Sequence, residues 1–322
     1  MIDQDRPAIL LTGPVMENVV ERQLASRFRL VSLADLTEED AARIPAVATR
    51  GAVRVDDAFM ARLPALRIVA NFGVGYDTVD AAAAAARGVV VTNTPDVLDD
   101  EVADLTLGLL LATVREIPRA ERFLRAGKWK EGAFPLGATL RGRRVGLLGM
   151  GRIGRAITRR LEGFGVEIAY HTRSPRADVP WPWFERLVDL ARAVDILVVI
   201  VPGGPATRNM VNAEVLSALG PDGILINVAR GTVVDEPELL KALQGRTILA
   251  AGLDVFAREP DVPEGFLALE NAVLLPHVGS STHYTRGAMG QLVVDNLVSV
   301  LDGKGPLTPV AETPWPLAAA RG

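Results

Sequence analysis

Short apolar runs alternate with helical patterns along almost the whole chain, and this alternation limits the fold more than any other feature of the sequence. Runs of this kind, separated by helices, are typical of parallel strands that are covered on both faces. The alternation therefore predicts an α/β fold with two doubly wound parallel sheets. The expected strands are residues 8–11, 29–33, 46–48, 68–71 and 89–92 in the first sheet, and 145–148, 167–170, 196–201, 224–227, 250–253 and 273–275 in the second.

Helical patterns divide the chain into two domains, as its length of 322 residues also suggests. Two long patterns flank the second series of strands, which indicates that one domain is inserted into the other. Residues 100–282 form the inserted domain, and residues 1–99 and 283–322 form the outer one. The expected helices are residues 100–126 and 282–301, with 153–164, 183–191, 213–219 and 236–243 between the later strands, and a proline-rich surface strap is expected at 306–316.

The composition excludes several classes of protein. With 49% apolar and 23% charged residues, the chain resembles a folded globular protein and not a disordered one. A net charge of −4 gives no electrostatic reason to expect nucleic acid as a partner. The chain has no cysteine and only three histidines, which excludes thiolate chemistry and makes a metal site unexpected.

The sequence also carries no signal for export or for a membrane. Its first residues lack the basic start and apolar run of a signal peptide, and no stretch reaches the roughly 18 apolar residues of a membrane span. We therefore expect a cytoplasmic protein without a membrane partner.

A glycine motif follows the expected strand 145–148 and opens a helix. In Gly149-Met150-Gly151-Arg152-Ile153-Gly154, the first glycine permits a tight turn and the second lets a pyrophosphate approach the backbone. Gly154 permits close packing of helix on strand, and the helix N-terminus offers N–H groups to the anion. In this context the motif predicts a Rossmann domain that binds a dinucleotide through Gly149, Gly151, Arg152, Ile153 and Gly154.

The residues after the next strand indicate the choice of dinucleotide. An acidic residue there binds the ribose of NAD, but this chain has His171-Thr172-Arg173-Ser174 and no carboxylate until Asp178. The guanidinium of Arg173 suits a 2′-phosphate, and the neighbouring hydroxyls add hydrogen-bond donors. We therefore expect NADPH to be preferred; NADH is the alternative if Arg173 is only a solvated loop residue.

Three segments with polar residues follow the later strands. Because the carboxyl ends of parallel strands share one edge of a sheet, these segments are expected to meet at one crevice. The segments are Asn227-Val228-Ala229-Arg230-Gly231, residues 254–260 with Asp254 and Glu259, and residues 276–282, which begin Pro276-His277.

These segments, the glycine motif and Asn71-Phe72-Gly73-Val74-Gly75-Tyr76-Asp77 together resemble the D-isomer-specific 2-hydroxyacid dehydrogenases, most of all their glyoxylate/hydroxypyruvate reductase branch. The resemblance covers nearly the whole chain. It implies a Rossmann cofactor domain at 100–282, inserted into a flavodoxin-like substrate domain. It also implies reduction of a small 2-oxoacid by NADPH to the D-2-hydroxyacid.

The resemblance assigns the catalytic roles to Arg230, Glu259 and His277. The ketone oxygen gains negative charge during reduction, and histidine is the natural proton donor near neutral pH. Glu259 would orient the imidazole and favour its charged form, and Arg230 would bind the substrate carboxylate and carbonyl oxygen. The structural alternatives are that His277 caps a strand end and that Arg230 pairs with a carboxylate such as Asp254.

Further contacts are implied by the same resemblance. The backbone N–H groups of Val74 and Gly75 would bind the substrate carboxylate, unless this turn only reverses the chain. Arg50 would help to receive an acidic substrate, although a surface arginine is equally consistent. His171 would reach the adenosine side at most. The remaining cofactor contacts would be Thr106, Val201, Pro202, Thr207, Val228, Ala229, Asp254 and Gly279, with Arg230 and His277 beside the nicotinamide.

Other interpretations stay open at this point. One is an enzyme with the same chemistry but another substrate, either an aromatic 2-oxoacid reductase or a short phosphoglycerate dehydrogenase-like enzyme. The other, outside enzymes, is a dinucleotide-sensing binding protein like the corepressors that share this fold. The apolar pattern at 100–126 would be too exposed in a monomer, and it predicts a homodimer.

Overall fold

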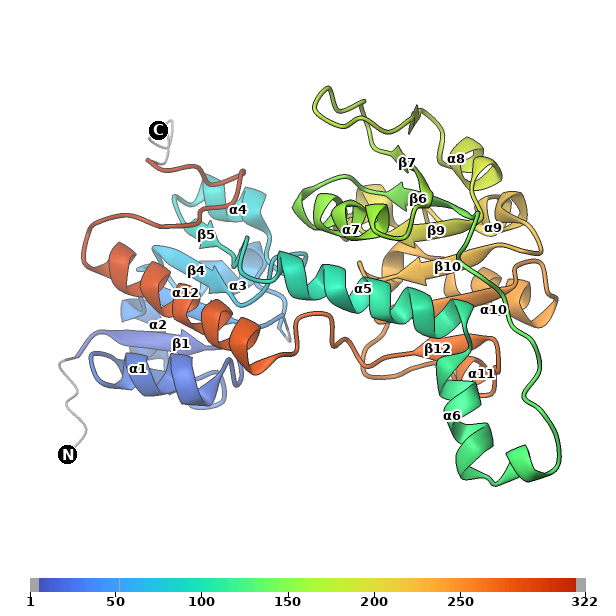
Figure 1. Ribbon diagram of the computed structural model, residues 1–322. Coiled ribbons are helices and arrows are strands. Elements are labelled where there is room, and N and C mark those ends of the chain that lie inside the picture. Colours follow the sequence, from blue (N-terminus) through green and yellow to red (C-terminus); the bar gives the residue numbers. More distant parts are fainter. Residues whose placement is uncertain (1–5, 52, 317–322) are drawn as a thin grey trace. The chain divides into compact units, whose positions relative to one another are not determined.

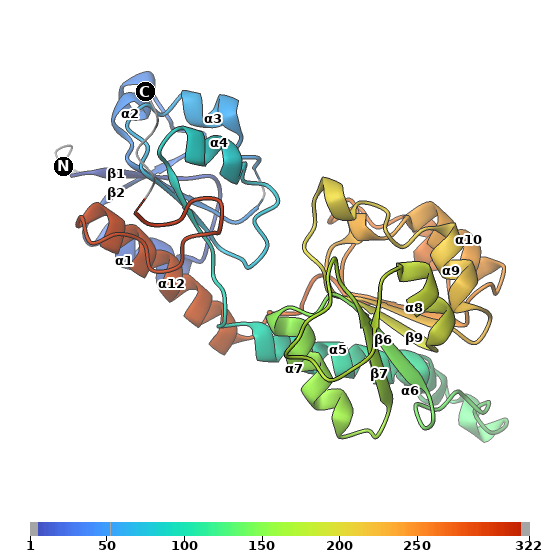
Figure 2. The same ribbon diagram turned by 90° about the horizontal axis from the view of Figure 1, so that it is seen from above.

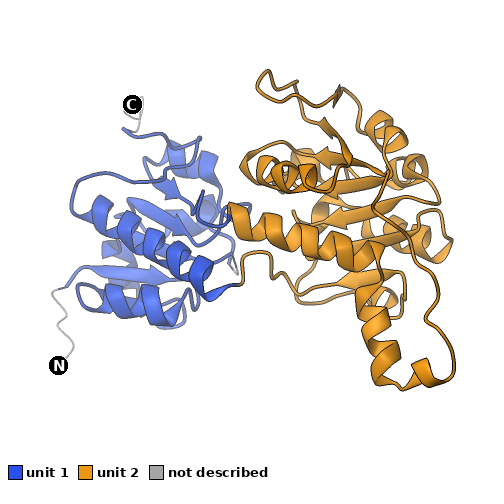
Figure 3. Cartoon of the chain, in the orientation of Figure 1, with its two compact units in different colours: residues 1–98, 282–322 blue, residues 99–281 orange. Residues whose placement is uncertain are grey.

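The computed structural model describes residues 6–51 and 53–316 and divides into two compact units (Figure 3). One unit runs to Leu98 and resumes at Thr282, and the other spans Asp99–Ser281. The junctions expected from the sequence, after residues 99 and 282, fall one residue later than these.

The first unit is built on a five-stranded parallel sheet of order β2-β1-β3-β4-β5 (Figure 1). From β1 the chain first forms β2 on one side and then crosses to form β3 on the other side of β1. The strand order therefore reverses between β1 and β3, which makes this position a topological switch point. The strands are β1 (Ala8–Leu11), β2 (Arg29–Ser32), β3 (Ala46–Thr49), β4 (Ile68–Asn71) and β5 (Val90–Thr92).

Helices cover both faces of this sheet. Figure 2 shows α2, α3 and α4 on one face and α1 and α12 on the other. The run of alanines at α4 is helical because Asp80 caps its start by accepting from the Ala83 N–H, and Gly88 follows with a positive φ of 70°. The helices are η1 (Glu17–Glu21), α1 (Arg22–Ala25), α2 (Glu38–Arg43), α3 (Asp57–Ala61), α4 (Ala81–Ala86) and α12 (His283–Leu301).

The second unit has a seven-stranded parallel sheet of order β12-β11-β10-β9-β6-β7-β8 (Figures 1 and 2). The chain starts at the inner strand β6, moves to one edge and returns to build the other, which is the Rossmann arrangement. The strands are β6 (Arg144–Leu148), β7 (Glu167–His171), β8 (Trp183–Phe184), β9 (Ile196–Val199), β10 (Ile224–Asn227), β11 (Ala250–Leu253) and β12 (Ala272–Leu274).

The strands of this sheet are mostly buried, and helices that pack against one of its faces form a hydrophobic core with it. The helices are α5 (Asp99–Val114), α6 (Ile117–Arg125), η2 (Lys128–Lys130), α7 (Arg152–Glu162), α8 (Leu187–Ala193), η3 (Pro205–Thr207), α9 (Ala213–Leu219), η4 (Gly231–Val233), α10 (Glu236–Gln244) and α11 (Glu264–Leu267). No helix within the described residues is both long and apolar enough to cross a membrane.

The helix expected at 100–126 is wrong as a single element. α5 ends at Val114, Glu116 adopts a left-handed conformation with φ of 52°, and α6 begins at Ile117. The reason is Pro118, which has no N–H for the carbonyl of Val114 and whose ring would clash with it in a continuous helix.

The helix expected at 183–191 is also wrong in its first half. Trp183 and Phe184 form the additional strand β8, paired with the end of β7, and α8 begins only at Leu187. The indole Nε1 of Trp183 donates to the carbonyl of Thr172 at 3.0 Å, and the Tyr170 N–H donates to Pro182 O at 2.9 Å, which holds this segment alongside β7. Trp183 and Phe184 are aromatic, and aromatic residues favour strands.

The proline-rich end is more than a surface strap. The N–H of Val310 donates to Val91 O at 2.9 Å, and the Val91 N–H donates to the Thr313 hydroxyl at 3.0 Å. Both Val310 and Thr313 are buried. The segment therefore covers the edge of the first sheet at β5, where exposed N–H and C=O groups would otherwise be left unpaired.

Candidate active site

The glycine turn between β6 and α7 has the geometry that an anion-binding turn requires. A Cβ on Gly149, whose φ is +112°, would lie 2.5 Å from Ile200 O, and one on Gly154 would lie 2.7 Å from Gly149 O. These two glycines are therefore required by packing. Gly151 precedes the first residue of α7, and a Cβ there would meet nothing within 4 Å. The second glycine thus leaves open space in front of the helix N-terminus, as a pyrophosphate needs.

The last residue of β7 and the residues just after it include an exposed arginine. The imidazole Nδ1 of His171 lies 2.9 Å from Phe184 O, and the hydroxyl of Thr172 donates to Ser174 O at 2.6 Å. Arg173 follows them and is exposed. Its side chain is thus accessible, whereas those of His171 and Thr172 already make contacts within the protein.

The first carboxylate after β7, that of Asp178, is paired with an arginine of α7. Asp178 Oδ1 and Oδ2 accept from Arg155 Nη2 and Nη1 at 2.9 and 2.7 Å. The hydrogen bond from Arg155 holds the pKa of Asp178 below its ordinary value. Asp178 is therefore bound to α7 and does not stand at the end of β7, where it would receive a ribose hydroxyl.

Two side chains predicted to be catalytic form a direct pair. His277 Nδ1 lies 2.6 Å from Glu259 Oε2, and the Phe256 N–H donates to Glu259 Oε1 at 3.0 Å. Burial acts to raise the pKa of Glu259, but the hydrogen bonds from His277 and Phe256, with the charges of His277 and Arg230, outweigh it and hold this pKa below its ordinary value. Because an ionised carboxylate only accepts, Nδ1 must carry the hydrogen, and Nε2 is left to exchange a proton elsewhere.

A buried carboxylate shapes the segment that carries the histidine. Asp254 is only 2% exposed, and its two oxygens accept the N–H groups of Val278 and Gly279, each at 2.8 Å. The Asp254 carbonyl accepts from the N–H of His277 at 2.8 Å. Burial raises the pKa of Asp254, and the two N–H groups oppose that effect. Asp254 thus anchors the backbone at His277 and at the two residues after it, and His277 itself has a left-handed φ of 53°.

The third predicted residue, Arg230, stands on a loop that packs against the glutamate segment. Asn227 accepts the Ala229 N–H at 3.1 Å and donates to Arg230 O at 3.1 Å, which closes the turn after β10. A Cβ on Gly231 would lie 1.9 Å from the backbone carbon of Phe256. The structure therefore brings Arg230, Glu259 and His277 together at the carboxyl edge of the second sheet.

Besides Arg230 and His277, the predicted substrate contacts belong to the first unit. Arg50 follows β3, at the switch point, and donates to Val15 O at 3.1 Å. Its guanidinium carbon lies 5.3 Å from the centroid of the Phe72 ring, and that of Arg286 lies 5.5 Å from the same centroid. The sequence did not single out Arg286, because its place on this ring depends on the packing of α12 against β3 and β4. Val74 and Gly75 follow Phe72 in the turn after β4.

The remaining predicted cofactor residues lie in the second unit. Thr106 is fully buried in α5 and donates to Val102 O at 2.6 Å, and the hydroxyl of Thr207 donates to Pro202 O at 2.7 Å. The others follow strands of the same sheet or lie beside Asp254: Val201, Pro202, Val228, Ala229 and Gly279.

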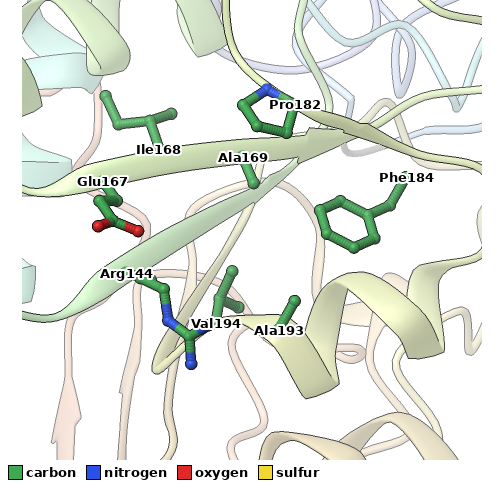
Figure 4. Close-up of a pocket in the computed structure, with 8 residues that line it drawn as sticks. All are labelled: Arg144, Glu167, Ile168, Ala169, Pro182, Phe184, Ala193 and Val194. Carbon is green, nitrogen blue, oxygen red and sulfur yellow. The ribbon is translucent and has the colours of Figure 1, made fainter.

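Two further observations limit where a ligand could bind. Arg144 and Glu167, at the amino-terminal ends of β6 and β7, are among the residues that line a pocket of about 170 Å³ (Figure 4). It is smaller than ordinary ligand sites of roughly 300–1,000 Å³ and lies away from the catalytic residues. In the part of the chain that the structure describes, no cluster of three histidine, aspartate or glutamate side chains could hold a metal ion.

A Rossmann sheet, an open glycine turn at a helix N-terminus and a carboxylate–imidazole pair near an arginine define a dinucleotide-dependent oxidoreductase. The family model described as "D-isomer specific 2-hydroxyacid dehydrogenase, NAD binding domain" matches residues 107–279. The chain belongs to the D-isomer-specific 2-hydroxyacid dehydrogenases.

Individual relatives cover nearly the whole chain. Hydroxyphenylpyruvate reductase of Plectranthus scutellarioides is 46% identical over 94% of this chain and 98% of its own. Glyoxylate/hydroxypyruvate reductase A of Arabidopsis thaliana is 45% identical with the same coverage. The crystal structure of NADPH-dependent glyoxylate/hydroxypyruvate reductase from Sinorhizobium meliloti, in complex with NADP and malonate, has a TM-score of 0.92 and 54% identity. It covers 96% of this chain and 98% of its own.

Proposed function

We propose that the protein is a reductase that transfers a hydride from NADPH to glyoxylate or hydroxypyruvate and yields the D-2-hydroxyacid. The observation that carries this proposal is the His277–Glu259 pair beside Arg230, at the carboxyl edge of a Rossmann sheet. The similarity to the reductases of A. thaliana and S. meliloti supports the substrates, and the NADP in the latter supports the cofactor.

The residues present fit a nicotinamide cofactor, because Gly151 leaves open space before α7. When bound, NADPH supplies the hydride. Residues Thr106, Gly149, Gly151–Gly154, His171–Ser174, Val201, Pro202, Thr207, Val228, Ala229, Asp254 and Gly279 are proposed to hold it. Arg173 would bind the 2′-phosphate, which the arrangement favours because Asp178 is paired with Arg155.

The catalytic step needs an oriented ketone, a stabilised oxyanion and a proton. Arg230 binds the substrate carboxylate and carbonyl oxygen and stabilises the charge that develops there. His277 Nε2 donates the proton to that oxygen, since Nδ1 is held by Glu259. The N–H groups of Val74 and Gly75, with Arg50 near them, receive the carboxylate of the substrate.

An aromatic 2-oxoacid is the second candidate substrate, because the P. scutellarioides relative is named a hydroxyphenylpyruvate reductase. A homodimer completes the proposal. The cytoplasmic location, and the lack of nucleic-acid and membrane partners, stay predictions from the sequence.

The test is the change in absorbance at 340 nm with glyoxylate, hydroxypyruvate, phenylpyruvate and 3-phosphohydroxypyruvate, each with NADPH and with NADH. We expect the fastest turnover for a small 2-oxoacid with NADPH, and a loss of roughly 10²–10⁴ in kcat for His277→Ala with unchanged cofactor affinity. Turnover mainly of phenylpyruvate would show that the substrate is an aromatic 2-oxoacid and not a small one. Inactivity with every pair, while NADPH still binds, would favour a dinucleotide-sensing protein.

A further inference from the structure

Two asparagine side chains hold successive carbonyl groups of the turn after β4. Asn71, the last residue of β4, donates from Nδ2 to Gly73 O at 3.1 Å and to Gly75 O at 3.0 Å. Asn93, the first residue after the neighbouring strand β5, donates from Nδ2 to Val74 O at 2.9 Å. Three consecutive carbonyls are therefore directed toward the two strand ends.

This arrangement determines where the N–H groups of the turn point. In a trans peptide the N–H is directed opposite to the carbonyl of the preceding residue. The N–H groups of Val74, Gly75 and Tyr76 must therefore point away from the asparagines. None of the three has an acceptor among the described residues. Successive N–H groups on the outer side of a turn form a concave site that binds an anion.

The second asparagine is itself held by the C-terminal segment. The hydroxyl of Thr308 donates to Asn93 O at 2.6 Å, and the Asn93 N–H donates to Thr308 O at 3.3 Å. Thr308 is in turn bound by Asn296 of α12, whose Oδ1 accepts the Thr308 N–H at 3.1 Å. The orientation of the Val74 carbonyl thus depends on a chain of hydrogen bonds that reaches α12.

We infer that Asn71 and Asn93 are positioning residues which turn the N–H groups of Val74, Gly75 and Tyr76 toward the carboxylate of the 2-oxoacid. The inference rests on the proposed function, and it adds Tyr76 as a third backbone donor. Arg50 and Arg286, both over the ring of Phe72, bring positive charge to the same turn. The two asparagines act on binding of the carboxylate and not on proton transfer, which belongs to residues of the other unit.

The experiment removes the donor of Asn93, which is half-buried and tolerates substitution better than the buried Asn71. We compare Asn93→Ala and Asn93→Asp with the wild type, measuring kcat and KM for glyoxylate, the dissociation constant of oxalate with NADPH present, and that of NADPH alone. Asn93→Asp keeps the shape but cannot donate to Val74 O. The matched control is Asn271→Ala, because Asn271 is also half-buried and its Nδ2 donates to two carbonyls, Leu243 O and Leu249 O, in the second unit.

For both Asn93 variants we expect KM and the oxalate dissociation constant to rise roughly 5- to 10-fold, with kcat within about threefold of wild type and NADPH binding unchanged. Asn271→Ala should lower only the melting temperature. Unchanged KM and oxalate binding in folded Asn93 variants would overturn the inference. If the wild type reduced no 2-oxoacid, the proposed function would fail, and the oxalate titration would still decide the role of Asn93.

Discussion

The hydrogen bond between His277 Nδ1 and Glu259 Oε2 links the proposed proton donor to a carboxylate that is ionised at neutral pH. The pKa of Glu259 lies below its ordinary value of 4.5, so the carboxylate keeps its charge throughout the neutral range. The stabilising contribution of Glu259 is present above pH 4.5 and is lost as the pH falls through the lower pKa of the folded state.

Replacement of Glu259 by glutamine should therefore change both kcat and the pH dependence of the free energy of unfolding. For Glu259→Gln we expect kcat to fall by roughly 10²-fold, because the imidazole loses its orienting charge. The fall in kcat should persist across the neutral range, because Glu259 is ionised there. Measurement of kcat from pH 6 to 9 checks this, and an unchanged kcat would contradict the role of the carboxylate. The loss of unfolding free energy caused by the substitution should disappear at pH values below the pKa of Glu259.

Arg173 provides the second test at the scale of one residue. Arg173→Asp should weaken NADPH binding far more than NADH binding, because it removes a charge-assisted contact and repels the 2′-phosphate. Fluorescence titration of both cofactors measures the ratio. Arg176→Asp is the matched control, because Arg176 lies three residues further along the same segment. Equal losses for the two cofactors would show that Arg173 does not distinguish them.

At the scale of elements, the three glycines of the turn between β6 and α7 differ in what they tolerate. Gly151→Ala should leave the fold and the melting temperature nearly unchanged, because its Cβ enters open space. That Cβ would stand where a pyrophosphate approaches the backbone, and we expect NADPH affinity to fall roughly tenfold or more. Gly154→Ala should instead destabilise the protein, since its Cβ would lie 2.7 Å from Gly149 O. If Gly151→Ala bound NADPH as the wild type does, the turn would not hold the pyrophosphate.

Sequence patterns predicted elements and site residues that depend on local chemistry. The glycine turn and the buried strands follow from short segments, so strands such as 224–227 and 250–253 were confirmed as β10 and β11. The break at Glu116 was missed although Pro118 signals it. β8 was missed because a two-residue strand exists only through its pairing with β7. The roles of Asn93 and Arg286 could not be predicted, since they depend on contacts between segments that are far apart in the chain.

At the scale of the whole molecule, the apolar surface that should drive dimerisation lies on α6 and the loop after it. α5 is largely covered within its own unit, where it packs against α7 and β11. By contrast, none of the nine residues of α6, all of them described, is buried, and Figure 1 shows α6 standing away from the sheet. Leu124 and Trp129 are 57% and 68% exposed, and with Ala120, Phe123 and Phe134 they line an apolar hollow.

An exposed apolar hollow of this kind is typical of an interface between subunits, and a twofold dimer is the simplest way to cover it. We expect sedimentation equilibrium to give twice the mass of one chain for the wild type. Leu124→Glu should give a folded monomer, because it puts a charge in the hollow without disturbing a buried residue. Leu267→Glu is the matched control, since Leu267 on α11 is 65% exposed and lies outside the hollow, so this variant should remain dimeric. A monomeric wild type, or a Leu124→Glu variant that still dimerises, would show that α6 does not form the interface.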